Sequence, residues 1–276
     1  RQHLLDVDEP PRFLARFIHV EKMLPPLPGV HDMLLADLLK MPAEVLKGIR
    51  AQLAAEVRQA AESLLADTAF AKQVDRLPLA AGSTVVGFGD SLTDDLQSWL
   101  EILRQVLEIR RPKDGITLVN AGASGECTTQ MLFRVPQVLS VNPSCVISMA
   151  GTNDARRFGA LPVTQVSLSE TRRNLAAFSE TAAKAGNVRW VWMTPPPVIE
   201  SRVSGHWFWT PMATSWNASD VQAIGDAMLA SKEQVVDLRP AFAGAAGADL
   251  ILDDGVHPTL QGQAAILRAL VATLAG

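Results

Sequence analysis

Two short segments of the sequence carry the residue types that can cleave an acyl bond. Ser91 ends the segment Gly-Phe-Gly-Asp-Ser, and Asp254 and His257 lie three residues apart in Asp-Gly-Val-His-Pro. A serine hydroxyl is a weak nucleophile until a base removes its proton. The imidazole of His257, with an unperturbed pKa of about 6.5, can act as that base. Asp254 is close enough in a turn to hold the other ring nitrogen and fix its tautomer.

Two further segments supply groups that can stabilise negative charge on a substrate oxygen. Gly125 lies in Asn-Ala-Gly-Ala-Ser-Gly, and Asn153 lies in Gly-Thr-Asn-Asp. The backbone N–H groups of Ser91 and Gly125 and the side-chain amide of Asn153 are donors of the required kind. The sequence has neither a Cys-x-x-Cys nor a His-Glu-x-x-His motif. We therefore expect an acyl-transfer site that uses no metal and no cofactor.

Taken one at a time, these residues have ordinary structural explanations. A serine after a strand is commonly a helix N-cap, and isolated asparagines and glycines are common in turns. Asp253 is a second carboxylate that competes with Asp254 for the same role. The other four histidines lack a comparable setting. The order of the four segments, each at the end of a predicted strand, favours the catalytic interpretation.

Beyond residue 80, the hydrophobic pattern predicts alternating strands and helices. Short apolar, β-branched runs predict strands at Thr84–Phe88, Ile116–Asn120, Cys145–Met149, Val188–Met193 and Gln234–Asp237. Helices are predicted at Leu96–Glu108, Thr129–Leu139, Val166–Ala185, Asp220–Ser231 and Leu260–Leu274. This alternation implies right-handed crossovers and a parallel sheet covered on both faces. Ligands of such sheets bind at the carboxyl ends of the strands, where the four segments should meet.

The first 80 residues have a different, helical pattern. A short helix is predicted over Phe13–Met23, and residues 31–75 are strongly helical, with Pro42 in the first turn of a second helix. Apolar residues with helical spacing form one face: Leu46, Ile49, Leu53, Val57, Ala60 and Leu64. We expect this face to pack on the rest of the protein. A cap, a dimerisation element and a partner-binding arm are the alternatives.

The four segments together resemble the sequence blocks of the SGNH hydrolases, also called the GDSL esterase/lipase family. The matching residues are Gly89-Asp90-Ser91-Leu92, Asn120 to Gly125, Gly151-Thr152-Asn153-Asp154 and Asp254-Gly255-Val256-His257-Pro258. The resemblance implies Ser91 as nucleophile and Asp254 and His257 as its triad partners. It also implies an oxyanion hole of Ser91, Gly125 and Asn153.

This resemblance carries expectations about fold and activity. It implies an α/β fold, a flavodoxin-like three-layer α/β/α sandwich with a five-stranded parallel sheet, over residues 81–276. Residues 1–80 would then be a helical extension packed on that body. The implied activity is hydrolysis of carboxylic esters, thioesters or acetylated small molecules through an acyl-enzyme. An acyltransferase needs the same triad, and a non-catalytic binding protein acting through the N-terminal helices is an alternative of another class.

The connection between Pro195 and Asp220 is long and rich in aromatic residues. Trp207 and Trp209 are candidate substrate-binding residues in a wall over Ser91. The alternative is a surface loop folded onto its own aromatic side chains.

Composition excludes several classes of function. The 276-residue chain has 25 Lys and Arg against 29 Asp and Glu, a net charge of −4, so no basic excess favours nucleic-acid binding. No apolar run is long enough to cross a membrane, and two cysteines cannot form a disulfide framework. The expected partner is a small ester substrate, and a homo-oligomer formed through the N-terminal helices is an alternative. A cytoplasmic location is expected, or a secreted one if a signal peptide has been removed.

Overall fold

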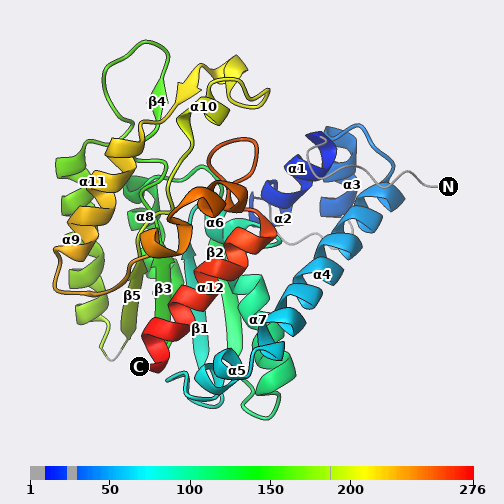
Figure 1. Cartoon of the computed structure of the whole chain (residues 1–276), viewed down its shortest axis with the longest axis vertical. Helices are drawn as coiled ribbons and strands as arrows, with labels where there is room; N and C mark the ends of the chain where they lie inside the picture. The colour runs from blue at the N-terminus through cyan, green and yellow to red at the C-terminus, as the bar shows by residue number, and fades with distance from the viewer. Residues whose placement is uncertain (1–9, 24–29, 187) are drawn as a thin grey trace.

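Five parallel strands form the centre of the molecule (Figure 1). The computed structural model describes residues 10–23, 30–186 and 188–276. The strand order is β2-β1-β3-β5-β7. The strands are β1 (Thr84–Gly89), β2 (Thr117–Gly122), β3 (Cys145–Met149), β5 (Arg189–Met193) and β7 (Gln234–Val236). Each predicted strand is present, with ends that differ by at most two residues.

Helices cover both faces of this sheet, so the predicted three-layer α/β/α fold is confirmed. One layer contains α7 (Trp99–Arg110) and α12 (Leu260–Ala275). The other contains α8 (Thr128–Ser140), α9 (Leu168–Lys184) and α11 (Ala218–Leu229). Successive strand residues point to opposite faces. Val85 and Ile147 therefore join the core under α7 and α12, whereas Phe88 joins the core under α8 and α9.

In the described part of the chain, five helices precede the first strand. They are α1 (Pro10–Phe17), α2 (Val20–Met23), α3 (Val30–Leu38), α4 (Ala43–Ala66) and α5 (Thr68–Asp75). The long helix α4 lies along α7, and α5 contacts both α7 and α12 (Figure 1). The C-terminal half of α4 joins the core shared with α7 and α12, whereas its N-terminal half forms a small third core with α1, α2 and α3. The division of the chain at residue 80 stays a prediction.

Two details of the N-terminal prediction are wrong. The expected single helix over Phe13–Met23 is divided into α1 and α2, because the His19 ring nitrogen Nε2 hydrogen-bonds the Arg16 carbonyl at 2.9 Å and ends the first helix. Pro42 is the residue before α4 rather than in its first turn. Ala60 of the predicted apolar face is partly buried against the core, and the adjacent Ala61 is fully buried.

The remaining elements are short. They are α6 (Ser91–Asp94), β4 (Arg157–Phe158), α10 (Glu200–Val203), β6 (Thr214–Ser215) and the 3-10 turns Thr210–Met212, Arg239–Phe242 and Ala245–Leu250. Strands β4 and β6 pair antiparallel, which the sequence analysis did not anticipate. Among the described helices, none is both long and apolar enough to span a bilayer.

Candidate active site

Ser91 is the first residue of α6, at the carboxyl end of β1. The turn between strand and helix is tight, because a Cβ atom on Gly89 would lie 2.5 Å from the Met149 carbonyl oxygen. Asp90 caps the helix by accepting the Leu92 N–H at 3.0 Å. This turn presents the Ser91 hydroxyl at the sheet edge where the predicted segments meet.

A chain of hydrogen bonds links Ser91, His257 and Asp254. The Ser91 Oγ lies 2.8 Å from His257 Nε2, and His257 Nδ1 hydrogen-bonds Asp254 Oδ2. All three residues are buried. The other carboxylate oxygen of Asp254 accepts the backbone N–H groups of Val256 and His257, each at 2.9 Å. The carboxylate thus fixes both the imidazole and the turn that carries it.

The electrostatic setting keeps Asp254 ionised. Burial opposes its charged form, but the charge and hydrogen bond of His257 and the two backbone N–H groups together hold the pKa of Asp254 below its ordinary value. Asp253, the competing carboxylate, is exposed. The geometry therefore favours Asp254 as the partner of the histidine.

The three candidate oxyanion donors border one cavity. Ser91, Gly125 and Asn153 all line it. The Ser91 N–H is one of the amides at a helix start that have no acceptor within the helix. Asn153 donates from Nδ2 to the Glu126 carbonyl at 3.0 Å, which orients its amide. Gly125 has a φ of +84°, and Arg156 donates to its carbonyl oxygen at 3.3 Å.

The cavity has a volume of about 820 Å³, within the range of roughly 300–1,000 Å³ typical of small-molecule sites. Trp209 lines it, stacks on the His257 ring at 6.0 Å and donates its indole N–H to the Asp254 carbonyl at 2.8 Å. Trp207 is 41% exposed, lies outside the cavity lining and packs edge-on against Phe13. Trp207 also packs edge-on against Phe208 at 5.6 Å, and both Phe13 and Phe208 line the cavity.

Sequence reasoning missed the side chains that α1 and α2 contribute to this cavity. Phe13 and Phe17 line it, and the Phe17 ring centroid lies 4.3 Å from that of His257. The available signal was the repeated spacing of four residues in α1, where Arg12 and Arg16 form one pair and Phe13 and Phe17 another.

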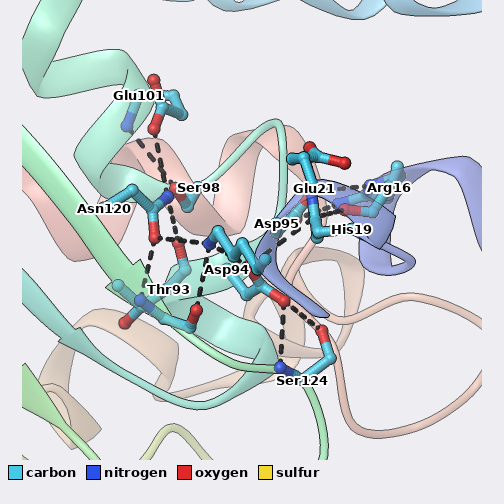
Figure 2. A network of polar contacts seen from close by, with 12 residues as sticks. Arg16, His19, Glu21, Thr93, Asp94, Asp95, Ser98, Glu101, Asn120 and Ser124 are labelled. Atoms are coloured by element: carbon cyan, nitrogen blue, oxygen red, sulfur yellow. Dashed lines mark hydrogen bonds and ion pairs between the residues drawn. The ribbon is translucent and has the colours of Figure 1, made fainter. Parts of the chain in front are cut away.

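A polar network joins α1 and α2 to the residues that follow Ser91 (Figure 2). Arg16 forms a two-point ion pair with Asp95, at 3.0 and 2.5 Å. Lys22 pairs with Asp94, whose second oxygen accepts the backbone N–H and the hydroxyl of Ser124 at 2.9 and 2.7 Å. The N-terminal helices are thus fixed to two of the loops that build the site.

Within the described residues, neither a metal-binding cluster nor a cysteine borders the site. The described residues form no cluster of three or more side chains suited to hold a metal ion. Cys127 and Cys145 are buried free thiols, and neither lines the cavity.

Comparisons with known proteins agree with this description. A sequence model of the GDSL-like lipase/acylhydrolase family matches residues 87–265. No curated protein sequence matches the chain significantly. The chain resembles the solved structures of an alpha/beta hydrolase enzyme from the metagenome of Lake Arreo, Spain, and of an acetylxylan esterase from Geobacillus stearothermophilus. The first is 23% identical with a TM-score of 0.55, and the second is 20% identical with the same score.

These alignments cover 71% of this chain and 96% and 95% of the two structures, respectively. A lipase/acylhydrolase from Enterococcus faecalis is 21% identical, with a TM-score of 0.54 and coverage of 70% and 96%. At these identities the structures bear on the fold alone. The family match begins at residue 87, so the helices α1 to α5 lie outside it.

Proposed function

The chain belongs to the GDSL-like lipase/acylhydrolase family and is a carboxylic ester hydrolase, and we propose that Ser91, His257 and Asp254 carry out the hydrolysis. The observation that carries this proposal is the hydrogen-bonded series from Ser91 Oγ through His257 to Asp254, bordering a cavity large enough for a small molecule.

In the acylation step, Ser91 Oγ attacks the ester carbonyl carbon while His257 Nε2 takes the hydroxyl proton. The carbonyl π electrons move to oxygen, and the N–H groups of Ser91, Gly125 and Asn153 stabilise that charge. The electrons then return, the bond to the alcohol oxygen breaks, and His257 gives its proton to that oxygen. The products are an acyl-Ser91 ester and a free alcohol.

In the second step, water takes the place of the alcohol. His257 accepts a proton from the water as its oxygen attacks the acyl carbon, and returns it to Ser91 Oγ as the acid leaves. Asp254 stays ionised throughout and stabilises the imidazolium. An alcohol or amine in place of water would make the same site an acyltransferase.

The test uses a fluorophosphonate, which labels an activated serine. We expect labelling of the wild type but not of Ser91→Ala, and a loss of turnover on the order of 10⁶ in Ser91→Ala and His257→Ala. Asp254→Ala should lose about 10⁴, and the matched variant Asp253→Ala should keep its activity because Asp253 is exposed.

Wild-type turnover in Ser91→Ala would refute the mechanism. A larger loss in Asp253→Ala than in Asp254→Ala would assign the role of the triad aspartate to Asp253. An unlabelled wild type that hydrolyses no ester would favour the non-catalytic alternative. Product analysis with water and an added alcohol in competition would distinguish hydrolysis from acyl transfer. A panel of p-nitrophenyl esters and acyl-CoA thioesters would define the acyl preference.

A further inference from the structure

Helix α1 presents two different pairs of side chains, each spaced by four residues. Arg12 and Arg16 are buried and point to carboxylates: Arg12 pairs with Glu56 of α4 at 2.8 Å, and Arg16 pairs with Asp95. Phe13 and Phe17 line the cavity that Ser91 and His257 border. The charged pair therefore fixes the helix, and the aromatic pair faces the cavity.

The aromatic pair lies next to the histidine. The Phe17 ring centroid is 4.3 Å from that of His257, and the Phe13 ring approaches it edge-on at 6.0 Å. Phe13 also contacts Phe17 at 5.2 Å and Phe208 at 5.4 Å. Together with Trp209, these side chains form an apolar wall beside the imidazole.

The wall is held in place by the helix that carries it and by α2. Asp94 and Asp95, which pair with Lys22 and Arg16, directly follow the serine turn. The backbone N–H of Leu96 also donates to the Arg16 carbonyl at 3.3 Å. The two charged side chains of α2 that line the cavity are themselves paired, Lys22 with Asp94 and Glu21 with Arg50. The side chains next to His257 are therefore aromatic rings, and α1, which carries two of them, is held by its ion pairs.

The chemistry assigns this wall to one part of the substrate. In the proposed mechanism His257 must give its proton to the leaving alcohol oxygen, so the alcohol group lies next to the imidazole. The acyl group stays bonded to Ser91. Side chains beside His257 therefore contact the alcohol, and a wall of phenylalanine and tryptophan rings favours an alcohol with a bulky apolar group.

We propose that α1 forms the alcohol-binding wall of the active site, and that Phe13 and Phe17 determine specificity for esters of bulky apolar alcohols such as arylmethyl alcohols. This proposal rests on the function proposed above. Phe13 and Phe17 lie outside the family match, so α1 adds this part of the wall to the hydrolase body.

The experiment compares two series of esters. In the first, the acyl group is butanoyl and the alcohol is ethanol or benzyl alcohol; in the second, the alcohol is ethanol and the acyl group is butanoyl or octanoyl. Values of kcat/KM are measured for the wild type, Phe13→Ala and Phe17→Ala. Phe17→Leu, which keeps apolar bulk without the ring, serves if Phe17→Ala fails to fold. Phe133→Ala is the matched control, because Phe133 is also a phenylalanine but is 82% exposed and lies outside the cavity lining.

We expect both alanine variants to lose about tenfold in kcat/KM for the benzyl ester relative to the ethyl ester. The octanoyl-to-butanoyl ratio should not change, nor should the deacylation rate of the butanoyl-enzyme, which has already released its alcohol. Phe133→Ala should keep the wild-type benzyl-to-ethyl ratio.

Equal losses for both alcohols, with slower deacylation, would overturn the proposal and leave Phe17 as a support for His257. A change confined to the acyl series would overturn it as well. A wild type that hydrolyses no ester and is not labelled at Ser91 would instead refute the proposed function, and this inference with it. If the wild type hydrolyses both esters, a negative result with the Phe13 and Phe17 variants would refute this inference alone and not the proposed function.

Discussion

Asp90 directly precedes Ser91 and is fully buried. One of its carboxylate oxygens accepts the Leu92 N–H, and the other, Oδ2, has no hydrogen-bond partner among the described residues. Burial raises the pKa of Asp90 from 3.8 to about 7. The carboxyl group next to the proposed nucleophile is therefore protonated in weakly acidic solution.

This shift predicts how stability depends on pH. Between about pH 4 and 7 the unfolded chain has lost the Asp90 proton while the folded protein keeps it, so the Asp90 contribution to stability falls as pH rises. The free energy of unfolding is measured in urea for the wild type and for Asp90→Asn. Relative to the variant, the wild-type value should fall by about 1.4 kcal/mol per pH unit in this window. If the free energies of unfolding of the two proteins changed with pH in parallel, the pKa of Asp90 would not be raised in the folded protein.

One of the two amide N–H groups of Asn153 has no acceptor among the described residues. The Asn amide has two N–H donors, and one of them binds the Glu126 carbonyl. If the other stabilises the oxyanion, which exists only after attack, Asn153→Ala should lower kcat by about 10²–10³ and leave KM nearly unchanged. A fluorophosphonate should still label Ser91, more slowly. A raised KM with an unchanged kcat would make the amide a substrate contact instead.

At the scale of elements, α1 depends on a buried ion pair. The side chains of Arg16 and Asp95 are 2% and 1% exposed. Arg16→Ala would leave Asp95 buried without its partner, and we expect a loss of about 3–5 kcal/mol in the free energy of unfolding. Replacing both residues by apolar ones of similar volume, Arg16→Met with Asp95→Leu, should restore part of that loss, because Asp95 also accepts the buried Gln97 N–H at 2.9 Å and leucine cannot.

An exposed pair provides the comparison for this variant. Arg110 and Asp75 also form a two-point ion pair, but their side chains are 44% and 43% exposed. Arg110→Ala should therefore change stability little, because water replaces the lost partner. Chemical denaturation of both variants measures the difference in their free energies of unfolding. Equal losses would show that burial does not determine how much the Arg16–Asp95 pair contributes to stability.

At the scale of the whole molecule, the N-terminal helices and the hydrolase body share a core. Val57, Leu64, Phe70 and Val74 of α4 and α5 are buried in the cluster that also contains residues of α7 and α12. Deletion of residues 1–75 would expose the apolar surface of α7 and α12 that these helices cover. We expect an insoluble or strongly destabilised protein.

Thermal unfolding and analytical ultracentrifugation of the deletion variant test this expectation. A soluble, monomeric and fully active product would show that the helices are a detachable module. A change from dimer to monomer, without loss of folding, would assign them to oligomerisation. Either result would also decide whether the boundary at residue 80 separates two units.

The sequence by itself determined the class of fold and the order of its elements. Short apolar runs such as Cys145–Met149 have the length of buried strands, and the intervening segments have helical spacing, so local pattern is enough to predict a covered parallel sheet. It also identified Ser91, His257 and Asp254 as candidates, because parallel topology brings the carboxyl ends of the strands to one edge. The family resemblance already favoured Asp254 over Asp253, and the burial of Asp254 beside an exposed Asp253 supports the same choice.

Only the tertiary structure decided where α1 lies. Its sequence indicates an amphipathic helix, but nothing local reveals that Arg16 pairs with Asp95, 79 residues away, or that Phe17 rests on His257. Contacts between such distant residues depend on how the helices pack, and packing depends on the shapes of all the surfaces involved rather than on the spacing within one element. For the same reason the sequence could define the catalytic candidates and Trp209, but not the part of the wall that α1 contributes.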